Sequence, residues 1–103
     1  MSGAELVELG EGRFGVRGVL DFTTVGALLS KGIAAFGGRH EVVLDLQGVI
    51  RSNSAGLALL LEWLDHGRVQ GFELSFVNPP DSLVAIARMS NVDALLSLPQ
   101  NGS

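Results

Sequence analysis

Ser54 is the residue in this sequence whose type and position could best do chemistry. It follows a short apolar strand and a polar loop, and it begins a strongly apolar helical segment. A helix N-terminus presents unpaired N–H groups and about half a positive charge, so it stabilises an anion such as a phosphoserine. Ala55 and Gly56 leave the backbone beside the hydroxyl uncrowded. Residue type alone also permits a plain cap or first-turn serine, and Asn53 or Ser52 is the alternative cap.

Other catalytic and metal chemistry finds little support in the residue types. A serine hydrolase would need a base and an orienting acid beside Ser54, and Asn-Ser-Ala-Gly is not a G-x-S-x-G turn. The chain has no cysteine, and its two histidines, His40 and His66, do not have the spacing of a metal site. No phosphate-binding G-x-x-x-x-G-K-(S/T) loop is present. We therefore expect no enzyme activity, no metal and no cofactor.

Composition limits the class of protein and of partner. The 103 residues are 47% hydrophobic and 17% charged, which suits one domain, residues 1–103, with a frayed tail at residues 97–103. The net charge is −4, with 11 acids against 7 bases, and Lys31 is the only lysine. Binding to nucleic acid or to anionic lipid head groups requires clustered bases, so both are disfavoured.

Location is predicted from two absences in the sequence. The N-terminus lacks a basic region followed by an apolar stretch, so we expect no signal peptide. No apolar run is long enough to span a membrane. We expect a cytoplasmic protein that reaches the inner membrane only through a partner, and a homodimer stays open.

The first half of the chain predicts a hairpin and a helix. Residues 6–9 and 14–19 have strand character and are separated by Gly10-Glu11-Gly12. Asp21 is the predicted cap of a helix over residues 22–36. The inward face of that helix is the set at helical spacing, namely Val25, Leu28, Leu29, Gly32 and Phe36.

The second half predicts alternating strands and helices. A central strand covers residues 41–46, a loop covers 47–53, and the strongest helix runs over residues 54–69 with a core stripe. A strand at 72–77, a helix beginning near Asp81 and a short helix at 92–96 capped by Asn91 complete the chain. The order β-β-α-β-α-β-α-α predicts an α/β fold, with helices packed on a mixed four-stranded sheet.

Three side chains near Ser54 have two interpretations each at this stage. Leu59 and Trp63 are helical i, i+4 neighbours that lie off the core stripe. They are either buried under the third predicted helix or exposed as an apolar patch that anchors a partner. Arg51 is either a solvated loop residue or a neighbour of a phosphate or partner carboxylate.

The pattern around Ser54 resembles the STAS family, which includes the anti-sigma-factor antagonists. The resemblance rests on the strand–loop–helix pattern D-L-x-G-V-x-x-x-(D/N)-(S/T)-x-G-L, which spans residues 45–57. Residues 18–21, Gly-Val-Leu-Asp, resemble the family's G-x-L-D, and residues 83–92 are similar to its last helical section. The resemblance thus covers nearly the whole chain and implies a SpoIIAA-like fold.

Within this family, residues 54–61 look most like the MlaB branch, whose members bind the cytoplasmic ATPase of an ABC-type phospholipid transporter. The resemblance implies that Ser54 occupies the Ser/Thr position, which is phosphorylated in antagonists and supports the ATPase contact in the MlaB branch. We expect a partner interface around Ser54 made of Arg51, Asn53, Ala55, Gly56, Leu59 and Trp63. Asn53 stands where the family usually has Asp, which favours a constitutive contact over control by an anti-sigma-factor kinase.

Overall fold

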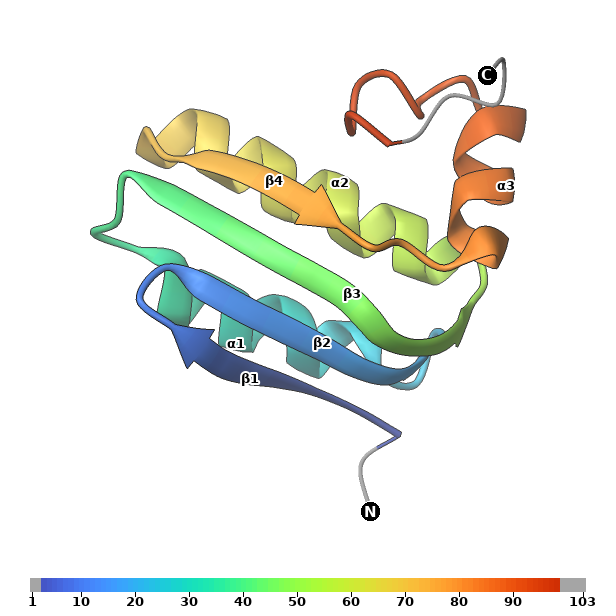
Figure 1. The fold of residues 1–103 in the computed structure, drawn as a ribbon, viewed down its shortest axis with the longest axis horizontal. Coiled ribbons are helices and arrows are strands. Elements are labelled where there is room, and N and C mark those ends of the chain that lie inside the picture. Colours follow the sequence, from blue (N-terminus) through green and yellow to red (C-terminus); the bar gives the residue numbers. More distant parts are fainter. Residues whose placement is uncertain (1–2, 99–103) are drawn as a thin grey trace.

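The computed structural model describes residues 3–98, which form four strands and three helices. Figure 1 shows how these elements are arranged. In chain order the elements are β1 (Ala4–Gly10), β2 (Arg13–Leu20), α1 (Val25–Phe36), β3 (Glu41–Ser52), α2 (Ser54–Gln70), β4 (Glu73–Val77) and α3 (Asp81–Met89). The predicted order of elements is confirmed up to α3.

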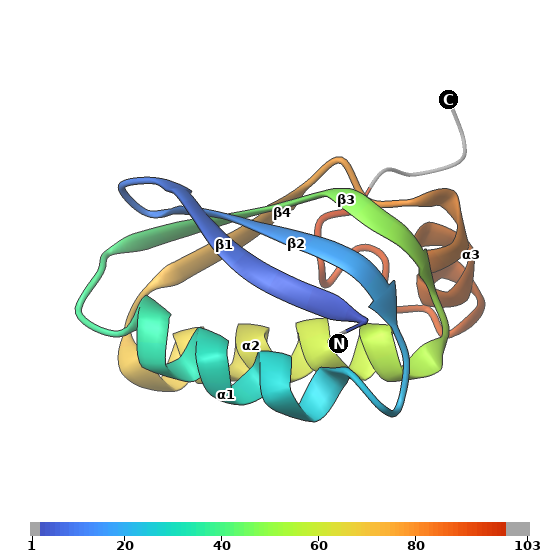
Figure 2. The ribbon, with the colours of Figure 1, turned by 90° about the horizontal axis from the view of Figure 1, so that it is seen from below.

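The four strands form one mixed sheet in the order β1-β2-β3-β4. β1 and β2 pair antiparallel, whereas β2–β3 and β3–β4 pair parallel. Figure 2 shows α1 and α2 side by side on the same face of this sheet. This arrangement confirms the predicted α/β architecture, because each parallel connection carries a helix back across the sheet.

The segment predicted as a loop, residues 47–53, is mostly strand. β3 continues to Ser52 and stays paired with β2 through Leu20. The register shifts twice, between Gly15 and Arg17 and between Gly18 and Val19 of β2, and β3 supplies the extra residue each time. Bulges of this kind break the alternation of inward and outward side chains, which is why the sequence pattern did not indicate a strand.

The first helix begins three residues later than predicted, and Asp21 is not its side-chain cap. The Asp21 carboxylate instead accepts hydrogen bonds from the Thr23 N–H at 2.9 Å and from the Thr23 hydroxyl at 2.6 Å. The Asp21 carbonyl accepts the Val25 N–H at 3.1 Å. Residues 21–24 are therefore an Asx-type turn that leads into α1.

The predicted last helix, residues 92–96, and its Asn91 cap are wrong. Residues 93–97 form turns, and Asn91 has a left-handed φ of 59°. Leu98 is 3% exposed and its N–H donates to the Asp93 carbonyl at 2.8 Å. The chain is thus still packed at a position assigned to the frayed tail, and residues 99–103 lie outside the described part.

An aromatic cluster fills the space between the sheet and the two helices. The Phe36 ring makes edge-to-face contacts with Phe14, Trp63 and Phe72 at centroid distances of 5.1, 5.4 and 6.2 Å. Trp63 also lies against Gly32, where a Cβ would overlap the indole Nε1 and come within 2.6 Å of Cε2. A residue without a side chain at position 32 therefore lets α1 and α2 approach each other.

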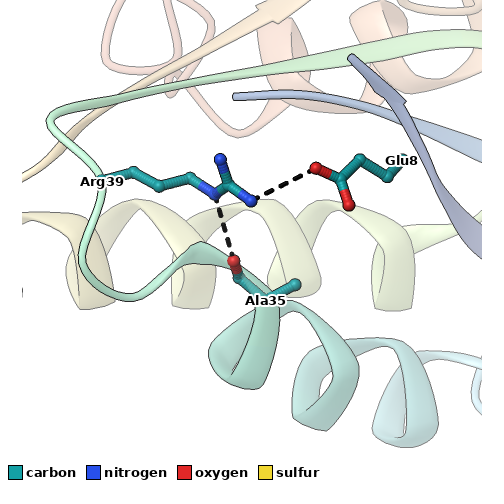
Figure 3. Close-up of polar contacts among 3 residues, drawn as sticks. All are labelled: Glu8, Ala35 and Arg39. Atoms are coloured by element: carbon teal, nitrogen blue, oxygen red, sulfur yellow. Dashed lines mark hydrogen bonds and ion pairs between the residues drawn. The ribbon is translucent and has the colours of Figure 1, made fainter. Parts of the chain in front are cut away.

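A second contact fastens the end of α1 to the edge of the sheet. The Arg39 guanidinium donates to the Glu8 carboxylate and to the Ala35 carbonyl, both at 3.3 Å. Figure 3 shows the three residues together. The same guanidinium lies 5.2 Å from the centre of the Phe14 ring. Because both charged partners are partly exposed, we expect this ion pair to orient the segment more than to stabilise the fold.

Two glycine substitutions in α1 test the fit between the helices. Gly32→Ala should lower the free energy of unfolding by roughly 1 kcal/mol or more, because the clash with Trp63 outweighs the gain in helix propensity. Gly26→Ala is the matched control, since a Cβ there meets no atom within 4 Å. It should raise stability by up to about 1 kcal/mol. Urea denaturation of both variants measures the difference, and equal stabilities would contradict the proposed fit.

Candidate functional site

The site lies at the edge of the sheet where the parallel strands end. β2, β3 and β4 each lead from this edge to the start of a helix. The Asn53 N–H donates to the Leu20 carbonyl at 3.1 Å, which joins the ends of β2 and β3. The Ser52 N–H donates to Ser82 Oγ at 3.3 Å, which joins β3 to α3. The loops at this edge therefore form one connected surface.

Ser54 is the first residue of α2, and its side chain is exposed. Asn53 is the cap, because its side-chain oxygen accepts the Ala55 N–H at 2.8 Å. Ser54 Oγ has no hydrogen-bond partner in the structure of residues 3–98. The cap function thus belongs to the preceding residue, and the Ser54 hydroxyl is free to meet another molecule.

Ser52, the alternative cap considered from the sequence, does not cap α2. It is buried, and its hydroxyl donates to the Asn53 carbonyl at 2.9 Å. A Cβ at Gly56 would overlap Ser52 Oγ and come within 2.9 Å of the Leu20 Cβ. Gly56 therefore allows α2 to begin directly against the end of the sheet. This packing fixes the position of the helix start that carries Ser54.

Four of the residues predicted to lie at the interface are buried. Ala55 and Gly56 face the domain, so they are not a surface for direct contact by their side chains, although Ala55 reaches the base of a groove between α1 and α2. Leu59 is 3% exposed and Trp63 is 0% exposed. The Trp63 Nε1–H donates to the Leu29 carbonyl of α1 at 3.3 Å. Leu59 and Trp63 are thus core residues, and Trp63 packs under α1 rather than under the third helix as one interpretation had it.

The segments that meet at this edge carry charged groups, among them Asp21, Arg51 and Asp81. The Thr23 hydroxyl, followed by the Thr23 N–H, lowers the pKa of the Asp21 carboxyl below its ordinary value of 3.8, and the Arg51 guanidinium adds a smaller lowering. Arg51 is exposed and forms no ion pair among the described residues. The sequence interpretation of Arg51 as solvent-exposed agrees with this, and its guanidinium is available to an acidic group.

Two exposed apolar side chains lie in the segments that end at this edge of the sheet, and neither was predicted to be exposed. Phe22, in the loop after β2, is 78% exposed, and Ile50, near the end of β3, is 75% exposed. Phe22 would have fallen on the inward stripe of a helix beginning at residue 22, but the later start of α1 leaves it outside. Ile50 is the extra residue of the second β3 bulge, between Val49 and Arg51, so the sequence pattern gave no signal for its exposure.

The described residues do not bring together a group of metal-ligating side chains. Within residues 3–98 no three His, Cys, Asp or Glu side chains come together as metal ligands. His66 lies against the Phe72 ring, at a centroid distance of 5.9 Å, and not beside Ser54. None of the described helices combines the length and apolar character needed to cross a membrane. At this edge the chain presents the Ser54 hydroxyl, the Arg51 guanidinium, the carboxylates of Asp21 and Asp81, and the exposed Phe22 ring.

Comparison with known proteins adds a family and a fold. Residues 8–97 match the family model described as Mlab, STAS domain, whereas no curated protein matches the sequence. The fold is similar to that of the anti-sigma factor antagonist SpoIIAA in its unphosphorylated form, with a TM-score of 0.71, 16% identity and coverage of 95% of this chain and 89% of that one. An anti-sigma factor antagonist from Mycobacterium paratuberculosis gives a TM-score of 0.68, 24% identity and coverage of 95% and 86%. Part of Mglu, 20% of that chain, matches 75% of this one at 23% identity and a TM-score of 0.58.

Substitutions at Asn53 test its role as the cap. Asn53→Ala should lower the free energy of unfolding by about 1 kcal/mol, because the Ala55 N–H loses its acceptor. Asn53→Asp keeps an acceptor and adds a negative charge at the helix N-terminus, so it should be at least as stable as the parent. Chemical denaturation at neutral pH distinguishes the variants. An Asn53→Ala protein of unchanged stability would refute the cap.

Substitutions at Thr23 test the turn before α1. Thr23→Val removes the hydroxyl donor and should raise the pKa of Asp21 towards 3.8, whereas Thr23→Ser should leave it low. Because the folded-state pKa is lowered, Asp21 stabilises the fold above its unfolded pKa, and this stabilisation is lost as pH falls through the folded pKa. Carbon-13 NMR titration of the Asp21 carboxyl gives the shift. The same pKa in the Val and Ser variants would exclude the hydroxyl as its cause.

Proposed function

We propose that this chain, which belongs to the MlaB-type STAS domain family, is a non-catalytic accessory subunit that binds the cytoplasmic ATPase of an ABC-type phospholipid transporter. The observation that carries the proposal is the exposed, unpartnered hydroxyl of Ser54 at the start of α2. The resemblance to the family implies that Ser54 occupies its Ser/Thr position, and the family match spans residues 8–97.

The construction of the helix start supports a preformed contact. Asn53 caps α2 and Gly56 lets the helix seat against Leu20, so the position of Ser54 is set before any partner arrives. A surface that is already ordered loses little conformational entropy on binding. Phe22, whose ring is exposed in the loop after β2, adds apolar area at this edge, as aromatic interface anchors commonly do.

The charge of the chain favours a protein partner over the lipid itself. Its net charge is −4 and it has a single lysine, so anionic head groups would repel more than attract it. We place the protein in the cytoplasm, at the inner membrane only through the transporter. Arg51 is available there to pair with a carboxylate of the ATPase.

The second candidate is an anti-sigma-factor antagonist controlled by phosphorylation of Ser54. The observation that favours it is the similarity in fold to SpoIIAA, together with a serine side chain that a kinase could reach. A phosphate would bring nearly two negative charges into the interface and release an acidic partner by repulsion. Asn53 favours the first candidate, because the neutral amide lacks the carboxylate that this position usually carries in the family.

Capture experiments with Ser54 variants test both candidates. The tagged chain, added to native membranes of its source, should recover an ABC-type ATPase together with its permease. Ser54→Glu should weaken this binding by roughly tenfold or more, because it inserts a charge and a larger side chain at the centre of the contact. Gln70→Glu adds the same charge at the opposite end of α2 and should bind normally. Both variants should fold, since both positions are exposed.

The outcomes separate the two candidates. Recovery of a serine kinase alone, with a phosphate on Ser54 detected by intact-mass measurement, would reject the transporter subunit. It would favour the anti-sigma-factor antagonist instead. Absence of phosphate in every growth phase would count against the antagonist. Equal binding by the Ser54→Glu and Gln70→Glu proteins would remove Ser54 from the interface in either case.

A further inference from the structure

A groove of about 270 Å³ runs between α1 and α2 beside the start of α2. The two helices lie side by side in Figure 2. The groove is lined by Phe22, Val25, Gly26, Leu29, Ala55, Ala58, Leu59 and Glu62. Its walls are therefore apolar apart from Glu62, and Phe22, at one end, belongs to the loop that borders the Ser54 surface.

Gly26 has no structural reason to be a glycine. Gly32 and Gly56 each avoid a clash, with Trp63 and with Ser52, but a Cβ at Gly26 meets no heavy atom within 4 Å. An exposed glycine in a helix costs about 1 kcal/mol relative to alanine. What the glycine does provide is space, because any larger side chain at position 26 would enter the groove.

The size and lining of the groove indicate what fills it. Small-molecule sites commonly have volumes of about 300–1,000 Å³ and a few convergent polar groups that orient the ligand. This groove is smaller and, among the described residues, has only the Glu62 side chain as a polar lining group. It suits an apolar side chain that another protein inserts.

The charge at the rim indicates the chemistry beside that side chain. Glu62 is exposed and has no ion pair or hydrogen bond from its side chain within residues 3–98. A carboxylate at the edge of an apolar groove is complementary to a basic residue that flanks the inserted side chain. The wide excess of acids over bases in the chain, 11 against 7, points the same way.

We propose that this groove receives an apolar side chain of the partner protein, and that an adjacent Arg or Lys of the same partner segment pairs with Glu62. This inference rests on the proposed function for the existence of a partner, and it adds the chemistry by which that partner is recognised. Ser54 and the groove then form one continuous contact surface, with a polar centre and an apolar flank.

The test fills the groove without disturbing the fold. Gly26→Leu should be as stable as the parent or more so, because leucine favours helix and the site is open, yet it should bind the captured ATPase roughly tenfold or more weakly. Gly26→Ala, which adds one carbon, is the matched control and should bind much closer to the parent. Urea denaturation measures stability, and surface-immobilised chain with purified ATPase measures affinity.

Variants at the rim test the charge. Glu62→Gln should weaken binding and make the affinity less sensitive to salt, and Glu62→Lys should weaken it further. If Gly26→Leu binds like the parent while Ser54→Glu does not, the groove is not part of the interface and this proposal is wrong. The proposed function would then still stand. If capture recovers a kinase instead, the same variants are measured against the kinase, and loss of binding there still supports the groove. If the parent chain is a dimer and Gly26→Leu makes it a monomer, the groove binds a second copy of the chain. That outcome would overturn the proposal.

Discussion

The contact of Trp63 with Gly32 is the constraint on which the rest of the molecule depends. A large indole on α2 occupies the place where a side chain on α1 would otherwise stand, and its N–H bonds to the backbone of α1 at Leu29. The two helices are thereby held close on one face of the sheet, with Phe36 packed against the same indole. Because protein interiors are close-packed, this fit determines how far apart the helices lie and how their N-terminal ends are presented.

The candidate contact surface follows from that geometry and from the parallel pairing of the strands. The carboxyl ends of β2 and β3 meet at one edge, where the bond from Asn53 to the Leu20 carbonyl ties them together. This edge is shared by Arg51 near the end of β3, Ser54 at the start of α2 and the exposed Phe22 in the loop after β2. The buried residues Ser52 and Gly56 do not contribute to this surface. They let the start of α2 pack against the end of the sheet. A rigid base therefore carries a small set of free groups, as is common for binding sites on loops.

Much of this could be read from the sequence, and the failures have physical causes. The helical spacing of apolar residues and the glycines between strands were reliable signals. They predicted the two main helices, the hairpin and the parallel strands, and they placed Ser54 at the start of α2. Two bulges in β3 concealed its second half, and the bond between Asp21 and Thr23 delayed α1, which exposed Phe22. Trp63 could not be assigned, because a helical wheel shows that it lies off the core stripe but not that a glycine on another helix makes room for it. Contacts between elements distant in the chain are the part that a single sequence does not reveal.

The two free edges of the sheet carry one further consequence. Glu5 and Glu8 lie on β1, and Glu73 lies on β4 beside Glu41 of β3. A second copy that added a strand to an edge of its own kind would bring carboxylates opposite carboxylates, and like charges across strands are unfavourable. These edge carboxylates therefore disfavour strand addition by a second copy of the chain and help to keep the sheet at four strands.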